Sequence, residues 1–279
     1  MLEKLVTVLV PTRNRPRTLK VTLSSIRDCV GARTRTIIGD NGNAEVTGKL
    51  LRENNDFGLD IVHLKNPSGY TYDKNLSLLL AAPKTDWLCV LHDDDFFVGR
   101  FQVPITNVLS LESVDFVFSD HWVASDLGII DENLSYESSV HYGRDKLTEG
   151  RVSDLEACVI SQSVCLDGYF VRTPVVQAIA VDLSLAPLAD SRLMLDIAHK
   201  TNGRGWYIRD RLFAYRLSEV SGTARGIDQI LLYKILKETR PISDRSKWLL
   251  RRRRRRQLWY AMRYSVKRLR ILDLLRAIS

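Results

Sequence analysis

Three consecutive carboxylates, Asp93, Asp94 and Asp95, directly follow an apolar run over residues 87–91 that is typical of a buried strand. Adjacent like charges repel one another, so a cation placed among them would be stabilising. Mg²⁺ and Mn²⁺ prefer oxygen ligands and usually share their coordination shell with substrate phosphates. The triplet therefore predicts a metal site that binds a diphosphate, and a solvated loop end is the alternative.

The segments before the triplet alternate between strands and helices, which indicates βαβ units on a parallel sheet. Polar residues follow three of the predicted strands, at positions 12–14, 40–41 and 93–95. Ligands of open α/β sheets bind beyond the carboxyl ends of the strands, so we expect these three groups to converge on one site. The predicted strands cover residues 5–10, 36–38, 59–64 and 87–91, and the predicted helices cover residues 17–28, 44–54 and 72–82.

The second half of the chain is less regular. Strands are expected at residues 115–119 and 206–209, and a helix with 3.6-residue periodicity is expected at residues 187–200. The whole pattern predicts an α/β fold in three layers, α/β/α, around a mostly parallel central sheet, followed by a basic amphipathic helical tail.

The basic charge of the chain is concentrated at its C-terminal end. The net charge is +8, but residues 245–279 contain 13 Lys and Arg and one acid, a net of +12, which leaves 28 basic and 32 acidic residues, a net of −4, in residues 1–244. The acidic body argues against a dedicated nucleic-acid-binding protein.

A helix predicted over residues 247–279 has an apolar side next to an arginine-rich face, with Trp and Tyr among the arginines. This composition suits the interface of an anionic membrane. Docking on the body or on a second subunit, and nonspecific nucleic-acid binding, are the alternatives. The apolar side comprises Leu258, Trp259, Met262, Val266, Leu269 and Leu272, and the basic face comprises Arg252, Arg256, Arg263, Lys267 and Arg270.

The sequence has no apolar run near the ~18 residues that a membrane span needs, and it begins without a signal peptide pattern. Its four cysteines are widely spaced, so neither a zinc site nor a disulfide framework is indicated. We expect a cytoplasmic protein, peripheral on the inner face of the cell membrane through its tail.

Together these motifs resemble those of the family 2 glycosyltransferases, which have the GT-A fold and use nucleotide-sugar donors; the resemblance covers about residues 4–218. Residues 8–14 resemble the strand and loop that hold the nucleobase, and Asp40 resembles the aspartate that contacts it. Lys74 and Asn75 stand where the family usually has Arg-Asn. The resemblance implies these donor-binding residues: Pro11, Thr12, Arg13, Asn14, Asp40, Asn41, Lys74, Asn75, Asp93 and Arg216.

The resemblance also implies a metal site and a catalytic base. Aligned on Leu91, the family's acidic motif begins at His92 and makes Asp94 and Asp95 the ligands of Mn²⁺ or Mg²⁺. The other register uses Asp93 and Asp95. His92 is then either a hydrogen-bonding partner or an ordinary strand-end histidine.

Asp190 follows Ala189 where the family has a Glu-Asp helix, and the resemblance makes it the general base that deprotonates an acceptor hydroxyl. The alternative is an aspartate favoured at a helix N-terminus by the helix dipole. Ser221 and residues 218–226 resemble the family's flexible closing segment and are a candidate lid. Arg216 is expected to pair with the diphosphate, and a structural salt bridge is its alternative.

The implied function is an inverting, metal-dependent sugar transfer from a nucleotide-diphosphate sugar to a saccharide or lipid-linked acceptor in cell-surface glycoconjugate assembly. Residues 1–115 would form the nucleotide-sugar-binding half and residues 116–244 the acceptor-binding half of one catalytic domain. Residues 245–279 would form the tail, which binds an anionic membrane or a second subunit. The alternatives are a non-catalytic binding module with this fold and a sugar nucleotidyltransferase.

Overall fold

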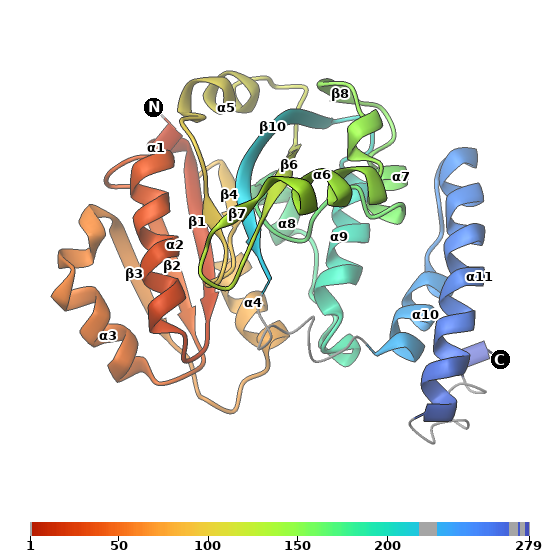
Figure 1. The fold of residues 1–279 in the computed structure, drawn as a ribbon, viewed down its shortest axis with the longest axis horizontal. Coiled ribbons are helices and arrows are strands. Elements are labelled where there is room, and N and C mark those ends of the chain that lie inside the picture. Colours follow the sequence, from red (N-terminus) through yellow and green to blue (C-terminus); the bar gives the residue numbers. More distant parts are fainter. Residues whose placement is uncertain (1, 218–227, 268–272, 274–276, 279) are drawn as a thin grey trace.

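A single ten-stranded sheet runs through the computed structural model, which describes residues 2–217, 228–267, 273 and 277–278. Its main path has the order β3-β2-β1-β4-β9-β6-β10-β5, and β7 and β8 pair at the side with β6 and β10. Figure 1 shows this sheet at the centre of the molecule, with the N-terminal units at one end and the last two helices at the other.

The first four strands of the sheet are parallel and carry the N-terminal half. They are β3 (Asp60–Lys65), β2 (Arg35–Asp40), β1 (Val6–Thr12) and β4 (Trp87–Val90). In-register pairing of Thr12 with Asp40 brings the carboxyl ends of β1 and β2 together, and the chain leaves β4 towards the acidic triplet at the same edge. The predicted strands are therefore present, within two residues at most boundaries.

The remaining strands extend the sheet through the second half. They are β5 (Phe96–Phe97), β6 (Phe116–Ala124), β7 (Ile130–Asp131), β8 (Gly150–Val152), β9 (Phe170–Arg172) and β10 (Gly205–Arg216). The short strand β9 is antiparallel to both β4 and β6, whereas β10 is parallel to β6. One continuous sheet thus joins the two predicted halves, and the α/β fold expected from the sequence is confirmed.

Helices cover both faces of the sheet, because successive residues of its buried strands point to opposite sides. Val8 and Val10 pack into one hydrophobic cluster and Leu9 into another. The first face carries α1 (Leu2–Leu5), α2 (Pro16–Cys29), α3 (Ala44–Glu53) and α5 (Gln102–Leu109). The second carries α4 (Tyr72–Ala81), α7 (Leu155–Ile160), α8 (Thr173–Gln177) and α9 (Ala189–Lys200).

Local signals in the sequence set the helix starts near the candidate site. Pro16 occupies the first turn of α2, where its missing N–H leaves no hydrogen bond unmade. Asn43 and Thr71 cap α3 and α4 by accepting hydrogen bonds from backbone amides of the first turn. The remaining short elements are η1 (Asn55–Gly58), α6 (Glu132–His141), η2 (Arg144–Lys146) and η3 (Leu183–Leu185).

The basic tail begins with α11 (Asp244–Lys267), which packs on α10 (Gln229–Glu238) and α7. The packed face contains Leu250, Gln257 and Ala261, which are all buried, whereas Trp259 and Met262 of the predicted apolar side are each 50% exposed. The alternative in which the apolar side docks on the body therefore does not hold for Trp259 and Met262, although Leu258 of that side is partly buried against α10. The side chains of Val266 and Lys267, and residues Leu269, Arg270 and Leu272, lie outside the described part.

Among the described helices, none combines the length and the hydropathy needed to span a membrane.

Candidate active site

The acidic triplet lies at the carboxyl edge of the sheet, immediately after β4. The amide of Leu91 still bonds the carbonyl of Leu9 on β1, so the chain is held against the sheet up to the residue before His92. All three aspartates have low exposure, between 1% and 9%. A solvated loop end, the alternative drawn from the sequence, does not describe this segment.

Asp93 is bound to the loop that follows β1. Its carboxylate accepts a hydrogen bond from the Thr12 hydroxyl at 2.7 Å and another from the Arg13 amide at 3.3 Å. Thr12, Arg13 and Asp93 were all assigned to the donor site, and the structure brings them into direct contact.

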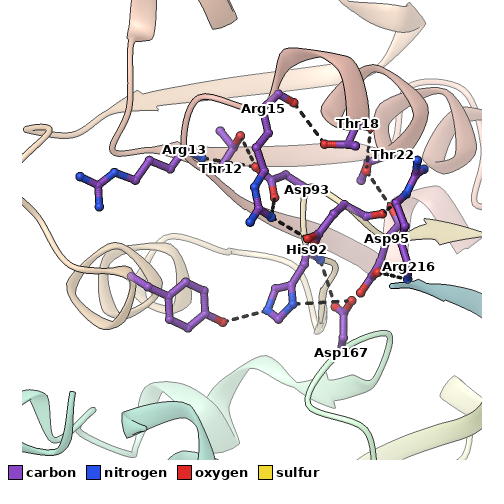
Figure 2. Close-up of polar contacts among 12 residues, drawn as sticks. Thr12, Arg13, Arg15, Thr18, Thr22, His92, Asp93, Asp95, Asp167 and Arg216 are labelled. Carbon is purple, nitrogen blue, oxygen red and sulfur yellow. Dashed lines mark hydrogen bonds and ion pairs between the residues drawn. The ribbon is translucent and has the colours of Figure 1, made fainter. Parts of the chain in front are cut away.

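Arg15 supplies the positive charge that the triplet needs in this structure. Its Nη1 lies 3.1 Å from Asp93 and 2.6 Å from Asp94, so one guanidinium bridges the two carboxylates (Figure 2). Although burial raises the pKa of Asp93, the charge of Arg15 acts in the opposite direction. Sequence reasoning assigned no role to Arg15, and its only signal was a position two residues after Arg13.

Asp95 points inward from the triplet and meets Asp167, an aspartate from the loop before β9. Burial raises the pKa of both carboxyls, that of Asp167 to about 6. The other oxygen of Asp95 accepts a hydrogen bond from the Arg216 amide at 2.7 Å. Asp167 also accepts a hydrogen bond from the His92 amide at 3.0 Å, which fixes the start of the acidic segment.

Arg216 holds the backbone of the acidic segment in place. Its guanidinium donates hydrogen bonds to the backbone carbonyls of Asp94 at 2.7 Å and Asp126 at 3.0 Å, and the residue is 4% exposed. These contacts make Arg216 a positioning residue in this structure, so the expected pairing with a diphosphate stays a prediction. The residues of the candidate lid, 218–226 with Ser221, lie outside the described part of the chain.

The residues that fit a divalent cation are His92, Asp94 and Asp95, each of which offers one ligand atom within 4.8 Å of the others. Asp95 Oδ2 is buried and has no hydrogen-bond partner in the described structure, as expected of an oxygen that a cation would satisfy. Oxygen and imidazole ligands suit Mn²⁺, and the two carboxylates suit Mg²⁺. This set matches the register that assigned Asp94 and Asp95 to the metal and adds His92.

His92 connects the acidic segment with helix α4. Its Nε2 is 2.8 Å from the Tyr72 hydroxyl, and its Nδ1 is 3.9 Å from Asp167 (Figure 2). The ring is therefore held in one orientation by partners on two sides, unlike an ordinary strand-end histidine.

A groove of about 440 Å³ opens beside the triplet, between the ends of β1 and β2. Three residues assigned to the donor, Arg13, Asn14 and Asn41, line it. Asn14 has a positive φ of 59° and accepts a hydrogen bond from the Asn43 amide at 2.7 Å, so the loop after β1 is tied to the start of α3. Pro11 is a buried residue of β1, two positions before Arg13, which lines the groove.

Asp40 and Asn75 are buried supports of the groove. The two oxygens of Asp40 accept hydrogen bonds from His63 at 3.1 Å and the Gly42 amide at 2.8 Å, and these bonds, with one from Thr47, lower its pKa in spite of burial. Asn75 donates to the Gly39 carbonyl at 2.7 Å. The nucleobase contact expected of Asp40 stays a prediction. Lys74 lies on the first turn of α4, with Nζ 6.0 Å from the centre of the Tyr70 ring.

Asp190 lies in the first turn of α9, close enough to His92 for the charges of the two side chains to interact. Burial raises its pKa to about 6, Asp73 adds to the rise, and the nearby His92 opposes it. Its carboxylate accepts a hydrogen bond from the Ser191 amide at 2.6 Å. Both interpretations of this residue are therefore compatible with its position, because it lies in the first turn of a helix and near His92 of the candidate metal group.

Asp73, which sequence reasoning missed, fixes the start of α9. It is 1% exposed, and Oδ1 accepts a hydrogen bond from the Ala189 amide at 3.0 Å. This bond joins α4 to α9, so it sets the distance between the acceptor-side helix and the donor edge of the sheet.

Comparison with known proteins identifies this architecture. Residues 7–102, from β1 through the acidic triplet to the start of α5, match the family model for glycosyl transferase family 2. No curated protein matches the chain in sequence. Among solved structures, S. aureus TarS 1–349 in complex with UDP-GlcNAc aligns with a TM-score of 0.72 and 14% identity, covering 98% of this chain and 79% of that chain.

A second similar structure is the mannosyltransferase PcManGT from Pyrobaculum calidifontis in complex with GDP-Man and Mn²⁺. It aligns with a TM-score of 0.61 and 13% identity, covering 92% of this chain and 72% of that chain. In a longer S. aureus TarS structure (TM-score 0.59, 14% identity), the alignment covers 83% of this chain but only 38% of that chain.

The fold is that of the GT-A nucleotide-sugar transferases. The part of the chain that matches glycosyl transferase family 2 is therefore residues 7–102, which contain the acidic triplet.

Proposed function

We propose that the chain transfers a sugar from a nucleoside-diphosphate donor to an acceptor hydroxyl with inversion at the anomeric carbon. The observation that carries this proposal is the placement of His92. It belongs to the group with Asp94 and Asp95 that fits a cation, and it is also close enough to Asp190 to lower the pKa of that carboxyl. The proposed base and the proposed diphosphate-binding group would therefore meet at one strand end.

The donor would lie along the carboxyl edge of the sheet, with the nucleoside in the groove lined by Arg13, Asn14 and Asn41. His92, Asp94 and Asp95 would hold Mn²⁺ or Mg²⁺, which supplies Lewis-acid stabilisation of the departing diphosphate. Arg15 pairs with Asp94 in this structure. A cation at Asp94 would release this guanidinium, which could then bind diphosphate oxygens.

Asp190 would accept the proton of the acceptor hydroxyl as its oxygen attacks the anomeric carbon and the bond to the diphosphate breaks. A single displacement of this kind inverts the configuration. A carboxylate with a pKa near 6 is still ionised at pH 7 and is a stronger base than an ordinary aspartate, so its environment suits the role.

Nucleotide binding tests the donor part of this proposal. We expect UDP or GDP to bind at least about tenfold more tightly with Mn²⁺ or Mg²⁺ than in EDTA, because the cation bridges the acidic segment and the diphosphate. Isothermal titration of the full chain measures this difference. Equal affinities with and without a divalent cation, for both nucleotides, would contradict the proposed metal role.

We also propose that the acceptor is lipid-linked and that the enzyme works on the inner face of the cell membrane. The exposed surface of the tail supports this proposal. One side of α11 is unpacked among the described residues and combines aromatic, apolar and basic side chains. Trp248, Trp259 and Met262 are between 50% and 58% exposed, and arginines lie over both indole rings. We define the basic–aromatic face as Trp248, Arg252, Arg255, Trp259, Met262 and Arg263.

We expect the full chain to bind vesicles of phosphatidylcholine with one quarter phosphatidylglycerol, but not vesicles of phosphatidylcholine alone, because each basic residue near an anionic surface contributes about 1 kcal/mol. Replacing Trp248, Trp259 and Met262 together by Ala should lower the partition coefficient at least about tenfold. The matched control replaces Val103, Leu127 and Ile129, exposed apolar residues of the body, by Ala. Equal sedimentation of the two triple variants with the vesicles would contradict the assignment of this face.

A further inference from the structure

A second pocket, of about 400 Å³, lies between β6, α6, η2 and β10. None of the residues assigned to donor, metal or base lines it. Two register shifts interrupt the pairing of β10 with β6, one between Ile208 and Arg211 and one between Arg211 and Phe213. Bulges of this kind redirect side chains and often lie beside binding sites. Here they place Arg209, Asp210 and Arg211 along the pocket.

The floor of this pocket is a fixed ion-pair network. Asp120 is 5% exposed, and its two oxygens bind Arg144 at 2.6 Å and Arg211 at 3.2 Å. The Arg144 guanidinium also donates to the Ser138 hydroxyl at 2.8 Å. These polar groups are held before any ligand arrives, which lowers the entropic penalty of binding.

Aromatic side chains form the walls. The Arg211 guanidinium carbon lies 4.5 Å from the centre of the Trp122 ring. Tyr136 on α6 is 65% exposed. The hydroxyl of Tyr207 donates to the Arg144 carbonyl at 3.4 Å, so this ring is anchored to η2. The pocket therefore combines apolar ring surface with planar groups that form hydrogen bonds.

The charges that line the pocket cancel. It contains three carboxylates and three guanidiniums, namely Asp120, Asp145, Asp210, Arg144, Arg209 and Arg211. A diphosphate would meet three carboxylates, whereas a neutral sugar ring offers C–H groups to the aromatic faces and hydroxyls to both kinds of charged group. A neutral saccharide fits this lining better than a nucleotide does.

The pocket is also connected to the candidate active site. Strand β10 lines it at Arg211 and ends at Arg216, beneath the acidic triplet. The separation along the strand is at most ~17 Å at ~3.3 Å per residue, which is within the reach of a short oligosaccharide.

We propose that this pocket binds a neutral saccharide unit of the acceptor chain, at a distance from the hydroxyl that receives the new sugar. The assignment of this saccharide to the acceptor chain rests on the proposed transferase function. The binding of a neutral saccharide is tested without turnover.

The test is saturation-transfer NMR on the full chain with a panel of neutral tri- to hexasaccharides of glucose, mannose, galactose and N-acetylglucosamine. We expect at least one member to bind, and Tyr136→Ala and Trp122→Ala each to weaken its affinity about tenfold through loss of aromatic contact. Trp122→Phe should restore most of the affinity and shows whether loss of folding explains the alanine variant. Val140→Ala, at an exposed position on the same helix, should leave the affinity unchanged.

Excess UDP with Mn²⁺ should not displace the bound oligosaccharide. Displacement would assign the sugar to the donor site and overturn the proposal, as would failure of every panel member to bind or binding that both alanine variants leave unchanged. Binding through Tyr136 in a chain that releases no nucleoside diphosphate from any donor would overturn the transferase proposal but not the saccharide pocket. Sugar transfer by a chain that binds no oligosaccharide of the panel would overturn the saccharide pocket but not the transferase proposal.

Discussion

Replacing Asp94 by Ala is expected to lower metal-dependent transfer by about a thousandfold or more while the protein stays folded. Lewis-acid stabilisation of the leaving diphosphate is worth several kcal/mol, and each ~1.4 kcal/mol corresponds to a factor of ten in rate. The cost in stability should stay within about 1 kcal/mol, because Arg15 is partly exposed and keeps its contact with Asp93 when Asp94 is lost. Initial rates across a Mn²⁺ titration, with thermal unfolding of the same samples, measure both effects.

The matched control for this variant is Asp60→Ala. Asp60 also pairs with one arginine, Arg35, but it does so on the exposed edge of β3. Asp60→Ala should keep wild-type turnover and Mn²⁺ dependence. Turnover by Asp94→Ala at the wild-type rate would remove Asp94 from the metal site and would favour the register with Asp93 and Asp95.

Replacing Asp190 by Asn is expected to lower kcat by about 10²–10⁴-fold, the usual contribution of a positioned general base. Asn keeps the size of the side chain and can still accept a hydrogen bond from the Ser191 amide, so the start of α9 should survive. The variant is best measured at saturating donor and Mn²⁺, where a change in kcat reports on the chemical step.

The wild-type enzyme should lose activity as pH falls through about 6, since burial raises the pKa of Asp190 to that value and only the ionised carboxylate accepts a proton. Asp196→Asn is the control, because Asp196 is on the same helix but pairs with Arg192 at 3.0 Å. It should leave both kcat and the pH profile unchanged. A near-normal kcat in Asp190→Asn would exclude Asp190 as the base and leave it an aspartate favoured in the first turn of α9 by the helix dipole.

The donor half of the fold could be predicted because its signals are local. Apolar runs that end in polar residues at Thr12, Asp40 and Asp93 are visible in the sequence, and parallel strands bring such ends to one edge. The structure confirms that β1 pairs with β2 on one side and with β4 on the other. The convergence of Asp190 on this edge came only from the family resemblance, since nothing near Ala189 in the sequence points to His92.

The supports of the site could not be predicted, because they depend on contacts between distant residues. Asp73 bonds the Ala189 amide across 116 positions, and Asp167 bonds the His92 amide across 75. Asp73 reads locally as an ordinary residue in the first turn of a helix. Its burial is decided by the packing of α4 against the second half of the chain, which no short pattern encodes.

The tail shows a similar limit. Periodicity indicated a helix and a face rich in apolar residues, but the neighbouring elements decide which face packs. Arg253 and Arg254 donate hydrogen bonds to backbone carbonyls at the ends of α7 and α10, and Ala261 lets the helices approach closely. These contacts turn Trp259 and Met262 outward, opposite to the arrangement in which an apolar stripe covers the body.

The most direct test of the proposed function is release of nucleoside diphosphate from a panel of UDP-, GDP- and dTDP-sugars, with Mn²⁺ or Mg²⁺ and with EDTA. We predict that at least one sugar donor is turned over only with a divalent cation, and that Asp94→Ala and Asp190→Asn each abolish this turnover. Binding of nucleotides without release of diphosphate from any donor would contradict the enzyme and favour a non-catalytic module. Release of pyrophosphate from a nucleoside triphosphate and a sugar phosphate would instead indicate a nucleotidyltransferase.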